Sequence, residues 1–596
     1  MTNAANTVVR IGGASGFWGD SSVGAPQLVR SGQIDYLVFD YLAELTMSIL
    51  AAARAKNPEL GYATDFVSVT MKSLLKEIVS RGIRVISNAG GVNPQACARA
   101  IAALAAEQGV EVRIGVVLGD DVSPLLPQLR GEDVRELQSG AALPEKILTA
   151  NAYLGAQPIK AALDAGAQIV ITGRCVDSAV TLGALMHEFG WTPEQFDLLA
   201  QGSLAGHIIE CGAQATGGLH TDWESVPDWA HIGYPVIECH ADGHFVVGKP
   251  EGTGGLVSPA VVGEQMLYEI GDPGSYLLPD VVCDFRQVQM RSVGVNRVRV
   301  SGALGRAPNE NYKVCATYMD GFRCDGQLTI VGMDAARKAR RTAEAILERT
   351  RELFQAHGWP DYSRTHIEIM GSELGNYGPQ ARTAAVREVV MRVSVMHPLK
   401  AALELFAREI APAGTSWSPG TTGAGGGRPS PSPCIKQFAF LLGKTRLQPQ
   451  LQIDGGVQPL ELVHATEPAG ATPALPTANP ASQMSDLVEV ELIRLAWARS
   501  GDKGNTSNIG VIARQPEWLP WLRQQLTEQR VAGWLAHLVQ GRVTRYDLPG
   551  IHAMNFVCEQ ALDGGGMASL RNDPLGKGMA QILLSMPVQA PRAWLA

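Results

Sequence analysis

The N-terminal third of the chain alternates short apolar runs with segments of helical periodicity. Between the runs, apolar residues recur at helical spacing, as they do from Val67 to Ile78, and glycines such as Gly82 and Gly109 end the helices. Strands that alternate with helices favour a parallel sheet wound by right-handed crossovers. We therefore predict an α/β fold with a wound, mostly parallel sheet in the N-terminal part. The predicted strands cover residues 8–11, 36–39, 83–87, 110–118 and 168–171.

The pattern changes after about residue 225, where short β-like runs separated by turn residues replace the regular alternation. A long amphipathic helix is predicted over 335–355. Residues 467–486 are rich in Pro, Ala and Thr, which indicates a linker between domains. After the linker we predict a small α+β domain that contains a strand over 488–498 and a helix over 517–535. The predicted domains are an α/β domain over 1–466, with a parallel-sheet part at about 1–225 and a mixed α+β part with β-rich additions at about 226–466, and a C-terminal domain over 487–596.

The composition excludes several classes of protein. The chain has 596 residues, of which 45% are hydrophobic and 18% charged, so it can bury large cores and is not disordered. The formal net charge is −8 and no long basic run is present, which argues against a nucleic-acid partner. No uninterrupted apolar stretch reaches about 18 residues, so we expect no membrane partner. The nine cysteines are scattered without a Cys-x-x-Cys motif, which predicts a reduced, cytoplasmic protein.

Glycine-rich polar segments follow the predicted strands, at 12–20, 88–93, 119–122 and 172–179. Because the carboxyl ends of parallel strands meet at one edge of a sheet, we expect these segments to gather there. Loops at that edge carry the chemistry of open α/β sheets. We therefore predict the active site at this edge.

The segment 172–179 is the richest in reactive side chains. Arg174 has the fork geometry that holds a carboxylate or a phosphate, and Asp177 can serve as a base or a metal ligand. Cys175 is a further catalytic candidate. Structural roles fit the same residues: Asp177 or Ser178 can cap the following helix, Cys175 can be a small buried hydrophobe, and Arg174 can pair with a structural carboxylate. The pattern leaves both interpretations open.

A second polar cluster, His207, Glu210 and Cys211, lies in glycine-flanked sequence. On a helix the spacing would place all three on one face, although the glycines fit a bent segment equally well. His207 and Glu210 are candidates for general acid and base catalysis, with a structural hydrogen-bond network as the alternative. The spacing matches no closed zinc pattern. A divalent metal ion at this cluster therefore stays an open question.

Two further groups are candidates for binding anions. Gly12, Gly13 and Gly16 follow the first strand and form either a phosphate cradle or a tight turn, and their spacing departs from the dinucleotide pattern. Lys249 precedes a glycine turn and either meets a substrate anion or is solvated on the surface.

A glycine turn in the C-terminal domain carries Arg499, Asp502 and Lys503. Polar residues around a glycine turn favour a fold-specific turn or a subunit contact over catalysis. We also expect the chain to form a homo-oligomer, with this domain at the contact between subunits.

Several separated motifs resemble the acyclic terpene utilisation protein family, the AtuA family. In the N-terminal part these are VRIGGASG from Val9, TGRCVDSA from Thr172, GHIIEC from Gly206, GTGGLV from Gly252 and YEIGDP from Tyr268. In the C-terminal part, RSGDKG from Arg499 and DGGG from Asp563 resemble the ferredoxin-like module of that family. The resemblance implies a role in the breakdown of acyclic terpenoids such as citronellol and geraniol through branched acyl-CoA intermediates. It also implies a ferredoxin-like C-terminal fold.

The reaction that the resemblance implies is cleavage of an intermediate similar to 3-hydroxy-3-isohexenylglutaryl-CoA. Such a retro-aldol step needs a base for the tertiary hydroxyl and a group that stabilises the developing negative charge. Our hypothesis is that Asp177 or Glu210 takes the proton, His207 relays it and Arg174 holds the free carboxylate. The CoA thioester is the substrate, and no cofactor is assigned. Known hydroxymethylglutaryl-CoA lyases are metal-dependent barrels with paired histidines, and this chain has no His-x-His motif.

Two alternatives remain. The first is another acyl-CoA enzyme at the same edge, either a hydratase or a CoA transferase. The second is a non-catalytic binding or assembly protein of the same pathway.

Overall fold

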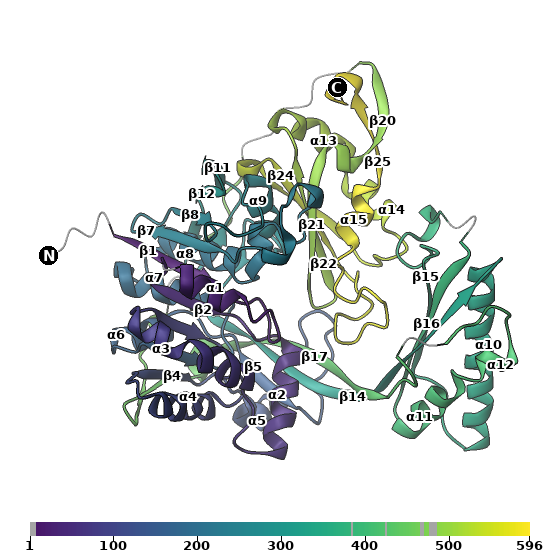
Figure 1. Cartoon of the computed structure of the whole chain (residues 1–596), viewed down its shortest axis with the longest axis horizontal. Coiled ribbons are helices and arrows are strands. Elements are labelled where there is room, and N and C mark those ends of the chain that lie inside the picture. The colour runs from purple at the N-terminus through teal and green to yellow at the C-terminus, as the bar shows by residue number, and fades with distance from the viewer. Residues whose placement is uncertain are drawn as a thin grey trace.

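A computed structural model describes residues 7–31, 33–382, 386–423, 426–464, 470–475 and 485–595. Its centre is an eleven-stranded sheet (Figure 1). In order across the sheet, the strands are β11 (Gln289–Gly294), β12 (Arg297–Ser301), β8 (Phe245–Gly248), β7 (Val236–His240), β1 (Val8–Gly13), β2 (Tyr36–Phe39), β3 (Arg84–Ser87), β6 (Ile169–Thr172), β4 (Ile114–Leu118), β18 (Gln450–Ile453) and β19 (Gly456–Pro459).

The strands β1, β2, β3, β6 and β4 pair in parallel, and the outer strands pair antiparallel. The prediction of an α/β fold with a parallel sheet in the N-terminal part and β-rich additions is therefore confirmed. The same sheet takes in β7, β8, β11, β12, β18 and β19 from the later part of the chain, so it crosses the division expected near residue 225. Periodicity indicates which residues are apolar but not which strands pair. It therefore cannot predict that strands from both parts of the chain form one sheet.

Helices cover both faces of the parallel strands (Figure 1). On β2, Leu37 and Phe39 face a core that includes α1, α3 and α4, whereas Tyr36 and Val38 face a core that includes α6, α7 and α8. The chain leaves β3 toward α4 on one face and leaves β6 toward α7 on the other. Such a reversal opens a crevice between the two strand ends. The helices are α1 (Gly24–Ser31), α3 (Lys72–Ser80), α4 (Pro94–Gln108), α6 (Gln157–Asp164), α7 (Ala179–Phe189) and α8 (Phe196–Ile209).

A second sheet forms a separate lobe beside the first (Figure 1). Its order is β15 (Arg364–Met370), β16 (Glu388–His397), β14 (Asn311–Val331) and β17 (Ser432–Gly443), and β5 (Thr149–Ala152) also pairs with β14. The helices α10 (Ala335–Ala356) and α11 (Lys400–Glu409) pack on it, which confirms the helix predicted over 335–355. The long strand β14 links this lobe to the N-terminal part through β5. The remaining elements before the linker include α2 (Glu44–Lys56), α5 (Leu126–Gly131), α9 (Pro259–Leu267), α12 (Ala413–Ser416), β9 (Tyr276–Leu277), β10 (Val282–Asp284) and β13 (Leu304–Arg306).

The C-terminal domain is a four-stranded antiparallel sheet with helices on it. The strand predicted over 488–498 is wrong, because a turn at Leu492–Arg494 divides it into β20 and β21. The helix predicted over 517–535 is also divided, since Thr527 caps a new helix by accepting a hydrogen bond from Arg530 N. Most of the linker predicted over 467–486 lies outside the described residues. The elements are β20 (Leu487–Glu491), β21 (Ala496–Lys503), β22 (Thr506–Ala513), α13 (Leu519–Gln525), α14 (Glu528–Trp534), β23 (Val543–Leu548), β24 (Ala553–Cys558), α15 (Met579–Leu584) and β25 (Pro587–Pro591).

Two buried asparagines fasten this domain to the turn that follows α9. Asn555 donates from Nδ2 to the carbonyls of Ile270 (2.8 Å) and Gly271 (2.7 Å), and Asn508 donates to the carbonyl of Leu267 (2.7 Å). The two amides also hydrogen-bond to each other at 2.9 Å. The contact therefore satisfies backbone carbonyls that would otherwise be buried without donors.

We predict that Asn555→Ala destabilises the protein by about 1–3 kcal/mol, because two buried carbonyls and the amide of Asn508 lose their partner. Chemical denaturation measures the change. Asn376→Ala, at an exposed position, is the control and should leave the free energy of unfolding unchanged. Equal stabilities of the two variants would contradict the role assigned to this contact.

Candidate functional site

The loops after four of the parallel strands meet at one edge of the sheet, as the sequence predicts. Asp120, after β4, accepts hydrogen bonds through Oδ2 from Arg174 N (2.9 Å) and from Asn151 Nδ2 (2.8 Å). Asn88, after β3, donates to Asp40 Oδ1 at 2.5 Å, and Asp40 directly follows β2. Side chains from separate loops thus position one another in the crevice beside β6.

Arg174 is almost completely buried, with 6% of its side chain exposed. Its Nη1 donates to Asp177 Oδ1 at 3.1 Å, and its guanidinium lies 4.2 Å from the ring centre of Tyr153 in a cation–π contact. The Tyr153 hydroxyl donates to Glu44. Burial raises the pKa of Glu44, but the charges of Arg174 and Lys313 outweigh that effect and lower the pKa to about 2. Arg174 is therefore held by protein groups, and its ion pair fixes the Asp177 carboxylate.

Asp40, Asp177 and Glu210 come from three different segments and share one electrostatic environment. Burial raises the pKa of Asp40 well above its ordinary value, and the negative charges of Asp177 and Glu210 raise it further. Burial also raises the pKa of Glu210, although the charge of His207 opposes that rise. Neighbouring carboxyls in a buried site cannot all ionise. The arrangement therefore keeps a protonated carboxyl close to the Asp177–Arg174 ion pair.

His207 lies in the last turn of α8 and is buried against Glu210 and Met266. Its Nδ1 is 2.9 Å from Glu210 Oε1, without the alignment of a good hydrogen bond, and its Nε2 donates to Met266 O at 3.1 Å. Burial lowers the pKa of His207, but the charge of Glu210 outweighs it and leaves the pKa above its ordinary value. Because Nε2 carries a proton, a second proton can reside either on Nδ1 or on Glu210, and the two side chains titrate together. The helix brings the two side chains together, which is one of the two arrangements that the spacing left open.

The cysteines of the two clusters are unsuited to act as thiolates. Cys175 is 1% exposed, and burial raises its pKa to about 12. Burial likewise raises the pKa of Cys211 well above its ordinary value. Because only the thiolate is a strong nucleophile, Cys175 fits the role of a small buried hydrophobe.

The glycines at the end of β1 and in the loop after it are explained by packing against the chain itself. A Cβ on Gly12 would lie 3.1 Å from the Leu28 side chain, one on Gly13 would lie 2.5 Å from Ile209 O, and one on Gly16 would lie 2.8 Å from Cys211 Cα. Gly13 and Gly16 thus let the end of α8 approach and bring Glu210 to the crevice. Their amides are used within the protein, since Gly13 N donates to Pro235 O and Gly16 N donates to Asp20 Oδ2.

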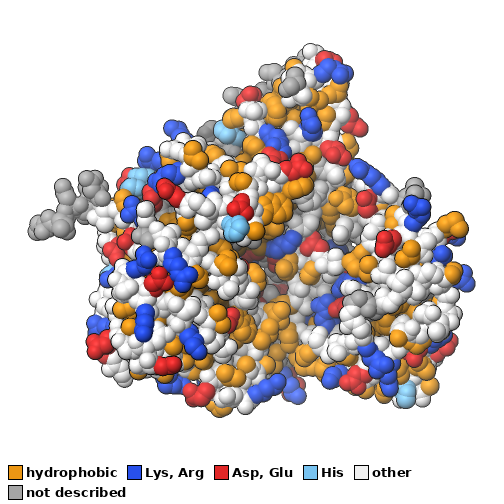
Figure 2. All heavy atoms as spheres, in the orientation of Figure 1, with side chains coloured by type: hydrophobic (Ala, Val, Ile, Leu, Met, Phe, Trp, Pro, Cys, Tyr) orange, Lys and Arg blue, Asp and Glu red, His pale blue; other side chains and the backbone are white. Residues whose placement is uncertain are grey.

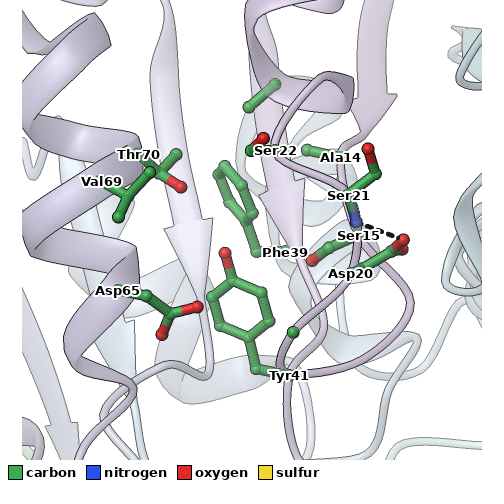
Figure 3. A pocket seen from close by; sticks show the side chains of 12 residues that line it. Ala14, Ser15, Asp20, Ser21, Ser22, Phe39, Tyr41, Asp65, Val69 and Thr70 are labelled. Carbon is green, nitrogen blue, oxygen red and sulfur yellow. Dashed lines mark hydrogen bonds between the residues drawn. The ribbon is translucent and has the colours of Figure 1, made fainter.

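The glycine loop also borders a cavity of about 260 Å³ on the α1 side of the sheet (Figure 3). Hydroxyl and carboxyl groups line it, and none of its described lining residues is basic. A phosphate would meet no positive charge from those walls. Its polar lining residues are Ser15, Asp20, Ser21, Ser22, Tyr41, Asp65 and Thr70.

Lys249 follows β8 on the same edge of the sheet as β1, because Gly248 is aligned through Val236 with Gly12. Its ammonium donates to the carbonyl of Thr253 at 2.7 Å and so closes its own turn. The structure gives this lysine a local structural role.

Metal ligands are a separate question. Within the ranges that the structure describes, no three His, Cys, Asp or Glu side chains are arranged to hold one metal ion.

The same part of the chain contains no helix that is long and apolar enough to cross a bilayer.

Sequence reasoning missed several residues of the crevice. Glu44 and Tyr153 lie in segments without a motif, and only the fold brings them to Arg174. Lys503, at the tip of the β21–β22 hairpin, was expected to be structural, yet its Nζ lies 2.5 Å from Glu269 Oε2 beside the crevice. Its place in the RSGDKG motif was the available signal. Arg499 in the same motif is buried and donates to Gln214 Oε1 at 2.8 Å, which fits a structural role.

Comparison with protein-family models gives two matches. Residues 9–453 match the acyclic terpene utilisation family protein AtuA, and residues 490–589 match the AtuA ferredoxin-like domain. The chain belongs to the AtuA family. Membership implies a role in acyclic terpene utilisation, and it identifies the C-terminal domain of this AtuA-family chain as ferredoxin-like. No match was found among curated proteins or among solved structures.

The raised pKa of Asp120, at this edge of the sheet, can be tested through the pH dependence of stability. Burial raises its pKa to about 6, so the folded state binds the proton more tightly than the unfolded state does. The stability that Asp120 contributes is therefore present at low pH and is lost as the pH rises from about 4 to about 6. Asp120→Asn keeps the acceptor for both donors but cannot ionise. We predict that its stability relative to the parent improves by about 1–2 kcal/mol between pH values of about 5 and 8.

Thermal or chemical denaturation at both pH values measures the difference. Asp121→Asn, on the same loop but exposed, is the matched control. A stability difference between Asp120→Asn and the parent that does not change with pH would show that Asp120 is ionised throughout.

Proposed function

We propose that this chain cleaves a carbon–carbon bond in a branched 3-hydroxyacyl-CoA formed during acyclic terpene breakdown. The hydroxyl proton leaves C3–OH for a base, the C3–O bond becomes a ketone, and the bond from C3 to the adjacent CH₂ group breaks. The electron pair of that bond passes to the CH₂ group as an enolate, which then takes a proton from an acid. The step therefore needs an ionised base and a protonated acid in one site, and no further reactant.

The observation that carries the proposal is the difference in environment between two neighbouring carboxyls. Asp177 is paired with Arg174 at 3.1 Å and keeps 28% of its side chain exposed, so it suits the base. Glu210, whose pKa is raised by burial, lies 2.9 Å from His207 and suits the acid. Carboxyls whose environments differ in this way divide the roles of acid and base between them. Asp40 in its protonated form limits the repulsion between them.

Arg174 has a different role here from the one that the sequence suggested. Its guanidinium is buried beside Asp177 and Tyr153, with 6% of the side chain exposed, so it is poorly accessible to a substrate carboxylate. We propose that it positions Asp177 through their ion pair. The substrate class is supported by the family, whose role in acyclic terpene utilisation requires enzymes for branched acyl chains.

The test is turnover of a branched 3-hydroxyglutaryl-CoA thioester, with the products identified by mass. We predict that Asp177→Asn lowers kcat by roughly 10²–10⁴-fold, which is the usual contribution of a general base. Asp121→Asn should retain the parent activity. Loss of water without cleavage would indicate a hydratase, and a CoA adduct on Glu210 would indicate a CoA transferase. Binding of the thioester with no turnover by the parent would favour a binding protein.

A further inference from the structure

The β21–β22 hairpin reaches from the ferredoxin-like domain toward the loops of the large sheet (Figure 1). Its turn contains Gly504, which has a φ of +62°, and Thr506 Oγ1 lies 3.5 Å from Gln138 Nε2 of the N-terminal part. A Cβ on Gly501 would lie 2.8 Å from Glu269 N, so the stem of the hairpin presses directly on the turn after α9. The tip is thus held in place from both sides.

Lys503 at this tip is more accessible than the arginines near the crevice. Its side chain is 50% exposed, compared with 6% for Arg174 and 6% for Arg499. Figure 2 shows a hollow between the lobes of the molecule in which basic and acidic side chains gather.

Glu269 orients Lys503 without neutralising the whole site. Its carboxylate lies 2.5 Å from Lys503 Nζ and 3.5 Å from Lys577 Nζ, so two cations share it. Lys577 also pairs with Asp502 at 3.2 Å. Burial and the charge of Glu269 raise the pKa of Asp502 to about 6. Because Glu269 is shared between two ammonium groups, it does not fully compensate the charge of Lys503.

Lys503 interacts electrostatically with Glu210, the proposed acid, and with Asp177, the proposed base. Its charge opposes the rise that burial causes in the pKa of Glu210. In turn, Asp177 helps to hold the pKa of Lys503 well above its ordinary value against the effect of desolvation, although Glu269 contributes more. The geometry agrees, because Glu269, the partner of Lys503, follows Met266 in the same turn, and the carbonyl of Met266 accepts from His207 Nε2. Lys503 therefore lies beside the His207–Glu210 pair.

We propose that Lys503, supplied by the ferredoxin-like domain, forms an anion subsite that binds the free carboxylate of the substrate. A single carboxylate fits better than a phosphate, because Glu269 and Asp502 would repel a multiply charged group. The branched 3-hydroxyglutaryl-CoA of the proposed function carries one such carboxylate. This inference rests on the proposed function, since it concerns the same crevice.

The test compares Lys503→Met with the parent full-length protein on two ligands. One is a branched 3-hydroxyglutaryl-CoA with a free carboxylate, and the other is its methyl ester. Calorimetry measures Kd, so the readout does not depend on turnover. We expect Lys503→Met to weaken binding of the acid by about 10- to 100-fold, the usual range for a charged hydrogen bond, and to leave the ester unchanged. Lys503→Arg should restore most of the affinity for the acid. Lys503→Gln, which also lacks the charge but keeps a polar side chain, replaces Lys503→Met as the probe if the latter does not fold.

Lys160→Met is the matched control, because Lys160 forms a surface ion pair with Asp164 on α6. Equal weakening of acid and ester by Lys503→Met would show a merely structural lysine and overturn the subsite. So would equal binding of the acid to Lys503→Met and the parent. Weaker binding of free CoA by the variant would assign Lys503 to the phosphates and also overturn it.

The experiments can reject the lyase activity and the Lys503 subsite independently of each other. Acid-specific loss of affinity without any cleavage by the parent would keep the subsite and reject the lyase. Cleavage that depends on Asp177 but not on Lys503 would keep the lyase and reject the subsite.

Discussion

Burying several carboxyls next to one another is the physical constraint on which this site depends. Each charge removed from water is costly unless a partner or a proton compensates it. Here Arg174 compensates Asp177 and Glu44, burial raises the pKa of Asp40 well above its ordinary value, and His207 lies 2.9 Å from Glu210. The compensation is specific to position, because each partner reaches its carboxyl from a different loop. The polar edge can therefore exist only if the whole sheet holds those loops together.

The sheet meets this requirement at β3 and β6, where the chain leaves the two neighbouring strands toward opposite faces. Asn88 and Asp40 arrive from one side of it, and Arg174 arrives from the other with Asp120 bound to its amide. Gly173 shows how close the approach is, since a Cβ there would lie 2.5 Å from Asp120 Oδ1. The end of α8 closes the crevice because Gly13 and Gly16 leave room for it. Membership of the AtuA family then gives this chemistry a metabolic setting.

Periodicity in the sequence was sufficient to predict the parallel strands, the loops at their carboxyl ends and the long helix α10. These features depend on local alternation of apolar and polar residues, which a single sequence displays. It was not sufficient for the pairing of β7 or β18 with the parallel strands, or for the break between β20 and β21. The partners of Arg174 were also beyond reach, because Tyr153 and Glu44 are brought to it by tertiary packing alone. The role of the glycines could not be decided from the sequence. A glycine cluster looks the same whether it makes room for a ligand or for another backbone segment.

The hairpin that carries Lys503 has a consequence for biosynthesis. The ribosome completes the sheet and its loops long before it reaches the last domain, so the nascent chain exposes an unfinished crevice and the bare turn after α9. Until the last domain is made, water must satisfy the carbonyls of that turn, and Asn508 and Asn555 replace the water when the domain docks.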